Sequence, residues 1–146
     1  MGFSGTIRTL RASDALAVAA LNAQLGYAAD TDEIRARVER IASEPRHSLL
    51  GAEDRNGLVG FVHFFERPSV DKGFDVVVQS LVVAEEQRNG GVGSALMEAV
   101  EAAAKSRSIA SVALSSRVDR SDAHAFYKRL GYEITAISNV FVKELS

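Results

Sequence analysis

Residues 87–96 read QRNGGVGSAL, and this stretch decides the fold that the sequence predicts. It follows the apolar run VVVQSLVVA (76–84) and precedes an alanine-rich stretch, which indicates a strand, a glycine turn and a helix. Glycine destabilises a helix by about 1 kcal/mol relative to alanine, so a glycine cluster at a helix entrance requires a reason. Glycine permits positive φ and close approach to the amides, and a helix N-terminus attracts anions. The stretch therefore predicts a local anion site.

The helix after the glycines has one buried face. Its apolar residues recur with the i, i+3, i+4, i+7 spacing: Val92, Ala95, Leu96, Ala99, Val100 and Ala103. A further strand, SIASVALSS (108–116), follows this helix. Strand, helix and strand in this order predict a β-α-β crossover between two parallel strands.

The rest of the chain predicts shorter elements on both sides of this unit. Strands are expected at 5–10, 48–53 and 58–65, with two more and a tight turn in 132–145, and helices at 13–26, 30–44 and 121–131. Ser13 is the expected N-cap of the first helix, and Asp30 with Glu33 resembles a capping box for the second. The turn DRNG (54–57) predicts a hairpin, and ERPSVDKG (66–73) is expected to be a loop.

Together these elements predict an α/β fold with a mixed sheet of about six to seven strands and about four flanking helices. No linker, repeat or low-complexity tract interrupts residues 1–146, which favours a single domain.

Composition excludes several classes of function. The chain is 47% hydrophobic and 25% charged with a formal charge of -2, so it has no general attraction for nucleic acid or an anionic membrane. It has no cysteine, which excludes a disulfide scaffold, a thiolate metal site and a cysteine nucleophile. Its apolar runs fall short of the ~20 residues that span a bilayer, and no secretory signal is evident, so the cytoplasm is the expected location.

Two familiar phosphate motifs fit the glycine turn poorly. A nucleotide-hydrolase loop needs Gly-Lys-Ser/Thr, whereas Gly93 is followed by Ser94 and Ala95. A dinucleotide fingerprint needs Gly or Ala where Leu96 stands, and an acidic residue that is missing from 102–118. A glycine turn that binds nothing remains the alternative reading.

The stretch RNGGVG matches the pattern Arg/Gln-x-x-Gly-x-Gly/Ala, with Arg88, Gly91 and Gly93 in the fixed places. It resembles the acyl-coenzyme A pyrophosphate loop of the GNAT superfamily of N-acetyltransferases. AHAFYKRLGY (123–132) resembles the second motif of that superfamily, Ala-x-x-Phe/Tyr-Tyr-x-x-x-Gly-Phe/Tyr, and the element order is similar over almost the whole chain. LNAQLGY, RSDAHAFY and SNVFVKEL are weakly similar to the aminoglycoside-acetyltransferase-like branch.

The resemblance implies a GNAT acyl-CoA N-acyltransferase-like fold in which acetyl-CoA, the co-substrate, lies where strands 76–83 and 109–116 splay apart. The main chain of Leu81, Val82 and Val83 would then pair with the pantetheine arm. The pyrophosphate would be bound by the backbone amides of the glycine turn: Arg88, Asn89, Gly90, Gly91, Val92, Gly93 and Ser94. Arg117 and Arg120 could contact the adenosine phosphates, although surface charge is the simpler interpretation. No metal is implied.

Tyr127 occupies the tyrosine position of the second motif, so the resemblance implies that it is the acid that protonates the departing thiolate. The alternative is a core residue, because Ala123, Phe126, Tyr127 and Leu130 form a helical stripe, in which Phe126 is read as core.

The base is less clear from the sequence. An acceptor amine with a pKa of about 10.4 must lose a proton, which costs roughly 4–5 kcal/mol at pH 7. Relatives often place an acid on the central strand, but here Gln79 stands there. His63, Glu66, Asp75 or a water chain are the substitutes, and His124 is read as structural. Tyr27, Glu33 and Glu66 are candidates for the wall that selects the acceptor.

The first hypothesis is therefore an acetyl-CoA-dependent N-acetyltransferase that acts on a primary amine of a small molecule or peptide by direct attack in a ternary complex. The alternatives are a non-catalytic acyl-CoA-binding sensor or interaction module, and a protein N-terminal acetyltransferase. The final predicted strand, NVFVKEL, would offer an edge for a homodimer. Coenzyme A and an amine are the expected partners, and neither nucleic acid nor a membrane is.

Overall fold

The structure is a computed structural model that describes residues 2–146, and these form two compact units that divide after Leu114. The first unit contains a five-stranded sheet: β1 (Thr6–Thr9), β2 (His47–Asp54), β3 (Gly57–Ser69), β4 (Gly73–Val83) and β5 (Val112–Leu114). Its helices are α1 (Ala15–Gln24), α2 (Thr31–Ala42) and α3 (Val92–Ser106), with short 3₁₀ helices η1 (Ala12–Asp14) and η2 (Glu85–Gln87). The second unit, Ser115–Ser146, contains α4 (Ser121–Arg129).

The sheet is mixed, as the sequence predicts. Its spatial order β1-β2-β3-β4-β5 follows the chain, and the first three pairings are antiparallel. β4 and β5 are parallel because α3 crosses over between them. The α/β class and the four helices are thus confirmed, while residues 2–146 contain five strands rather than six or seven. The single domain expected for residues 1–146 stays a prediction.

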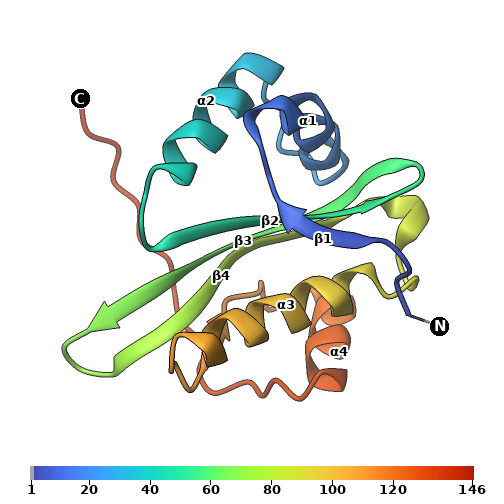
Figure 1. Cartoon of the computed structure of the whole chain (residues 1–146). Coiled ribbons are helices and arrows are strands. Elements are labelled where there is room, and N and C mark those ends of the chain that lie inside the picture. Colours follow the sequence, from blue (N-terminus) through green and yellow to red (C-terminus); the bar gives the residue numbers. More distant parts are fainter. Residues whose placement is uncertain (1) are drawn as a thin grey trace. The chain divides into compact units, whose positions relative to one another are not determined.

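Helices cover both faces of the sheet in the first unit. In Figure 1, α1 and α2 lie on one face and α3 lies on the other. The largest fully buried side chains are Phe64, Leu96, Met97, Val62, Val76, Val92 and Val100. Val62 and Phe64 share the α3 face with Gly60, where a Cβ would lie 3.0 Å from Val92. A second cluster, with Leu10, Val18, Leu21, Leu49, Phe61 and Val82 among its members, packs under α1 and α2.

The two predicted helix caps have different outcomes. Asp30 caps α2, and its Oδ1 accepts a hydrogen bond from the Glu33 amide at 2.8 Å, as the capping motif predicts. Ser13 does not cap α1, because it lies inside η1 and Asp14 takes the N-cap position without a side-chain hydrogen bond. Because η1 precedes it, α1 begins at Ala15 rather than directly after Ser13.

Two segments differ from the sequence prediction. The expected loop 66–73 is largely strand, because β3 continues to Ser69 and pairs with β4 as far as Gly73. The two strands expected in 132–145 are absent from the described residues, and large apolar side chains there are exposed, including Ile137, Val140, Phe141, Val142 and Leu145. An alternating apolar pattern shows strand preference, but a strand also needs a hydrogen-bonded partner.

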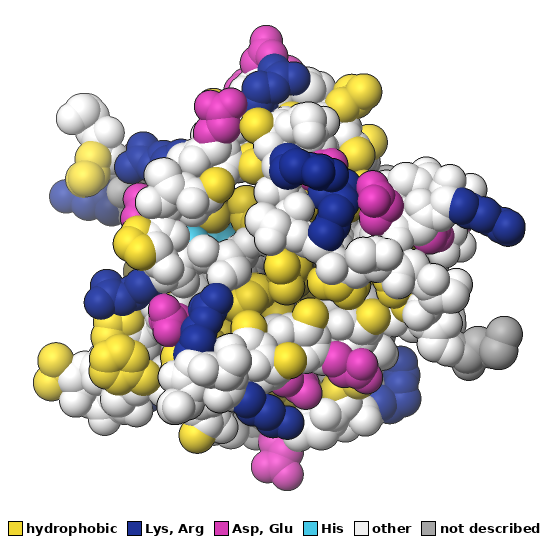
Figure 2. All heavy atoms as spheres, in the orientation of Figure 1, with side chains coloured by type: hydrophobic (Ala, Val, Ile, Leu, Met, Phe, Trp, Pro, Cys, Tyr) yellow, Lys and Arg dark blue, Asp and Glu magenta, His cyan; other side chains and the backbone are white. Residues whose placement is uncertain are grey.

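Charges of both signs are dispersed over the surface. Figure 2 shows Lys and Arg side chains interspersed with Asp and Glu on the face viewed. Among residues 2–146, no helix is both long and apolar enough to cross a membrane.

The α3 face of the sheet should contribute a large part of the stability. Phe64→Ala should lower the free energy of unfolding by about 3–5 kcal/mol, because it opens a cavity where the side chain is 1% exposed. Urea unfolding monitored by circular dichroism measures this change. Phe74→Ala is the matched control, since Phe74 is 62% exposed and its removal should shift stability by no more than about 0.5 kcal/mol. Equal losses in the two variants would contradict this packing.

Candidate functional site

A β-bulge in β4 shapes the centre of the sheet. Along β3, His63 pairs with Ser80 but the next residue, Phe64, pairs with Val78, so Gln79 has no partner on β3. On the opposite side, the parallel pairing with β5 runs from Val76 to Val78 and stops there. A bulge bends its strand and increases the local twist. β4 therefore parts from β5 at Gln79, the position where the sequence analysis noted an amide in place of an acid.

Beyond the bulge, β4 has one occupied edge and one open edge. Leu81, Val82 and Val83 pair with Val62, Phe61 and Gly60 of β3. In the described part of the chain, no strand pairs with 79–83 on the β5 side. Backbone groups on that side are free to hydrogen-bond an extended ligand, which fits the role expected of these three residues.

The glycine turn joins this open strand to α3. After η2, Arg88 is extended, and Asn89 and Gly91 take positive φ values of 69° and 84°. Gly91 is the N-cap of α3, whose first turn contains Val92, Gly93 and Ser94. Gly91 needs to be glycine for a second reason, since a Cβ there would lie 2.9 Å from the backbone nitrogen of Phe3.

The turn leaves a row of backbone amides without acceptors. Arg88 and Gly90 donate to the carbonyls of Glu85 and Gln87. Among residues 2–146, no acceptor is found for the N–H groups of Asn89, Gly91, Val92, Gly93 and Ser94, and no side chain caps α3. A row of unpaired N–H groups at the positive end of a helix is an arrangement that binds phosphate.

The side chains of the turn contribute less than its backbone. Val92 is 1% exposed and packs in the core, so it can offer a ligand only its amide. Arg88 is exposed and has no ion pair among the described residues, which leaves its charge available.

Of the expected bases, His63 lies nearest the bulge. It pairs with Ser80, the residue that follows Gln79. Glu66 is three residues along β3, and alternation places its side chain on the opposite face. Asp75 forms a two-point ion pair with Arg67 at 2.7 and 3.0 Å, so both of its carboxylate oxygens already have a partner.

His63 is paired with a histidine that the sequence analysis did not select. Nε2 of His63 lies 2.9 Å from Nδ1 of His47, across the β2–β3 pairing. Burial first, and the neighbouring His47 second, lower the pKa of His63 to about 4. His63 is therefore neutral at pH 7. His47 was missed because residues 47 and 63 are distant in sequence and only the strand register brings them together.

The second unit contains Tyr127 on α4. Its ring contacts Phe126 and Tyr132, with centroids 5.0 and 6.0 Å apart. Burial raises the pKa of the Tyr127 phenol above its usual value, so the hydroxyl keeps its proton at neutral pH. That protonation state suits an acid, and the aromatic packing also fits the core interpretation.

Three further residues of the second unit have local partners. Arg117 pairs with Asp119 at 3.1 Å and Arg120 with Asp122 at 3.5 Å, which fits ordinary surface charge. Nε2 of His124 lies 2.8 Å from the carbonyl oxygen of Arg117, which supports the structural interpretation of His124.

Two of the candidates for the acceptor wall lie at the surface. Tyr27 is 69% exposed, and Glu33 lies 3.6 Å from Arg37 on the surface of α2.

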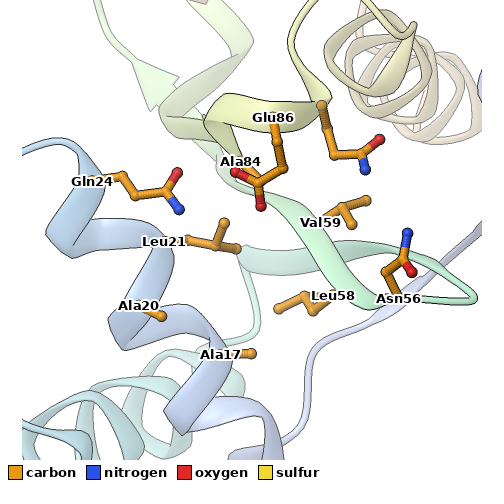
Figure 3. Close-up of a pocket in the computed structure, with 10 residues that line it drawn as sticks. Ala17, Ala20, Leu21, Gln24, Asn56, Leu58, Val59, Ala84 and Glu86 are labelled. Atoms are coloured by element: carbon orange, nitrogen blue, oxygen red, sulfur yellow. The ribbon is translucent and has the colours of Figure 1, made fainter.

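A cavity of about 310 Å³ lies beside η2 and is lined by α1, the β2–β3 turn and the segment 84–87. Figure 3 shows Gln24 extending from α1 towards the segment with Glu86, and Leu21 facing Leu58. The Gln24 side chain accepts a hydrogen bond from the Glu85 amide at 2.9 Å, so α1 supports the start of the glycine turn. Within residues 2–146, no group of three or more His, Cys, Asp or Glu is placed to hold a metal ion.

With this geometry established, comparison with known proteins gives one family. Residues 16–132 match the model of the acetyltransferase (GNAT) family. No curated protein matches the chain in sequence.

Solved structures share the fold at low identity. The transcriptional regulator from Bacillus halodurans C-125 has a TM-score of 0.86 at 19% identity, over 95% of this chain and 99% of that one. AAC(6')-Iy, in complex with the bisubstrate analogue CoA-S-monomethyl-acetylneamine, has a TM-score of 0.84 at 19% identity over 96% and 98%. Ribosomal-protein-alanine N-acetyltransferase from Brucella melitensis biovar Abortus 2308 has a TM-score of 0.78 at 24% identity over 97% and 100%.

The histidine pair gives a test that needs no substrate. In an NMR titration His63 should change protonation near pH 4, and His47→Phe should raise that pKa because a neighbouring ring that acquires charge is removed. The folded pKa lies below the unfolded value of about 6.5, so this group's contribution to stability is lost as the pH falls from about 6.5 towards 4. A His63 pKa near 6.5 would contradict the burial and pairing described here.

Proposed function

The chain belongs to the GNAT family of acetyltransferases, and we propose that it transfers the acetyl group of acetyl-CoA to a primary amine of a small molecule or peptide. The amine attacks directly while both substrates are bound. The observation that supports this most is the row of unpaired amides at residues 89–94, directly after the open edge of β4.

The two features together suit the two halves of coenzyme A. The amides of the glycine turn bind the pyrophosphate, with Arg88 adding positive charge. The open edge at Leu81, Val82 and Val83 hydrogen-bonds the amide groups of the pantetheine arm, as a strand would. From Val83 back to Gln79 the strand spans roughly 13 Å at about 3.3 Å per residue. The thioester end of the arm therefore lies by the bulge.

The base of this proposal is His63. It is neutral at pH 7 and lies opposite Ser80, next to the bulge where the thioester is placed. Gln79 cannot accept a proton at its amide, so the neighbouring strand supplies the base that the central strand lacks. A proton-accepting side chain contributes typically 10²–10⁴-fold to the rate of such a step.

The acid is Tyr127, whose raised pKa keeps its proton at neutral pH. The acceptor ammonium gives a proton to His63, and the neutral amine forms a bond with the thioester carbon. A free N–H on the open edge of β4 stabilises the oxyanion. The carbon–sulfur bond then breaks as the attacking nitrogen loses its second proton to solvent, and the thiolate takes the proton of Tyr127, which solvent replaces.

A thiol-release assay with acetyl-CoA and a panel of primary amines tests the activity. Turnover on at least one small or peptide amine is expected. Coenzyme A binding measured by calorimetry, without release of thiol on any amine, would instead favour a non-catalytic acyl-CoA-binding module.

Gly93→Val tests the phosphate cradle. A branched side chain in the first turn of α3 blocks close approach to the amides, so coenzyme A affinity should fall at least a hundredfold while circular dichroism stays unchanged. Ser94→Ala is the matched control, because it keeps its amide and should bind nearly as well as the parent chain. Unchanged affinity in Gly93→Val would refute the pyrophosphate assignment.

Tyr127→Phe tests the acid. Removing the hydroxyl should lower kcat by about 10²-fold or more, with a smaller change in KM, since the proton is needed only as the thiolate departs. Tyr132→Phe removes a phenol from the ring that contacts Tyr127 and should keep kcat within a few-fold. If steady-state rates of the two variants are alike, Tyr127 is a packing residue.

A further inference from the structure

The histidine pair on β2 and β3 offers more than a single proton acceptor. His47 lies two residues from Leu49, the cross-strand partner of His63, and its ring reaches diagonally to His63. Its other face is held by Phe65, with the ring centroids 4.9 Å apart and the planes 17° from parallel. Two contacts therefore fix the orientation of His47.

The hydrogen bond of 2.9 Å between Nδ1 of His47 and Nε2 of His63 limits the tautomers of the neutral pair. One ring must donate and the other accept. When His63 donates through Nε2–H, its Nδ1 keeps a lone pair that can accept a proton. His47 then accepts at Nδ1 and has its own proton on Nε2. This is the tautomer that the role of a base at His63 requires.

A single half-buried histidine would be a poor proton acceptor here. Burial penalises its imidazolium form, as the lowered pKa of about 4 reflects. His47 instead lines a cavity of about 580 Å³ at the surface, where its ring can exchange a proton with water.

Charged residues of both signs line that cavity. Its charged lining residues are Glu44, Arg46, Glu66 and Arg67. Arg67 is neutralised by Asp75 at 2.7 Å, which leaves two carboxylates against Arg46. The ionisable group that acts on His63 itself is His47.

We propose that His47 and His63 form a two-ring proton relay that moves the proton of the acceptor amine to the solvent in this cavity. The inference rests on the proposed function and deepens it, since His47 is assigned as a positioning residue and proton outlet for the base. It explains how a ring with little tolerance for charge serves as a base at neutral pH.

The relay balances in protons and moves no electrons between groups. The N–H bond of the acceptor ammonium breaks and a bond to Nδ1 of His63 forms. Nε2–H of His63 breaks as Nδ1–H of His47 forms, and the Nε2 proton of His47 passes to water. Both rings end neutral in the opposite tautomer, and proton exchange with water at the outer nitrogens restores the first.

His47→Phe separates the relay from packing, since it keeps a ring against Phe65 and removes both nitrogens. Relative to the parent chain, kcat/KM at pH 7 should fall about tenfold or more, and the acidic limb of its pH profile should shift. Added imidazole should restore part of the rate in His47→Phe but not in Tyr127→Phe. His124→Gln, which changes a histidine outside the pair, should keep the parent rate and profile.

An NMR measurement of the ring nitrogens is independent of turnover. Nδ1 of His63 should be unprotonated at pH 7 in the parent chain, with the proton shared with His47 on Nε2. A protonated Nδ1 of His63, or an unchanged pH profile in His47→Phe beside an inactive His63→Gln, would overturn the relay and leave acetyl transfer in place. A parent chain with the expected tautomer but no turnover on any amine would instead refute the proposed function, and with it the relay.

Discussion

The site depends on one irregularity, the β-bulge at Gln79. Without the extra residue, β4 would pair continuously with β3. The parallel pairing with β5 stops at Val78, where the bulge begins and where β5 itself ends at Leu114, and the last residues of β4 have an open edge. The edge to which we assign an extended ligand thus begins at the bulge, one strand away from His63 on β3.

The glycine turn supplies the second part of the proposed site, after the open edge of β4. Strand β4 ends at Val83, and within a few residues the chain reaches the unpaired amides before α3. Gly91 makes this possible, because its φ of 84° directs the chain into the helix and its lack of a side chain admits the backbone of Phe3. Gln24 of α1 supports the same region through the Glu85 amide. The groups that we propose to bind the ligand are therefore main-chain groups whose positions are set by packing on both sides.

Local patterns in the sequence predicted the central unit well. The strand, glycine turn and helix from 76 to 106 were expected from hydrophobic period and glycine chemistry, and the Asp30 cap from its spacing to Glu33. The continuation of β3 through Pro68 was missed, because Pro and charged residues read as a loop while pairing with β4 decides the outcome. The strands expected in 132–145 did not form for the reverse reason, since among residues 2–146 no strand pairs with this segment.

At the proposed site, one window of the sequence is enough to find the glycine turn but not the histidine pair. The motif around Arg88 and Gly93 is contiguous in the sequence, so it can be recognised from that short segment alone. His47 and His63 are brought together by the strand register, and no sequence pattern around either residue predicts that it contacts the other.

The most direct test of the account is amide hydrogen exchange with and without coenzyme A. The amides of 79–83 and 89–94 should exchange more slowly when coenzyme A is bound, because the open edge of β4 and the glycine turn both gain acceptors. Unchanged exchange in these two segments, with protection confined to the cavity between α1 and the β2–β3 turn, would contradict it.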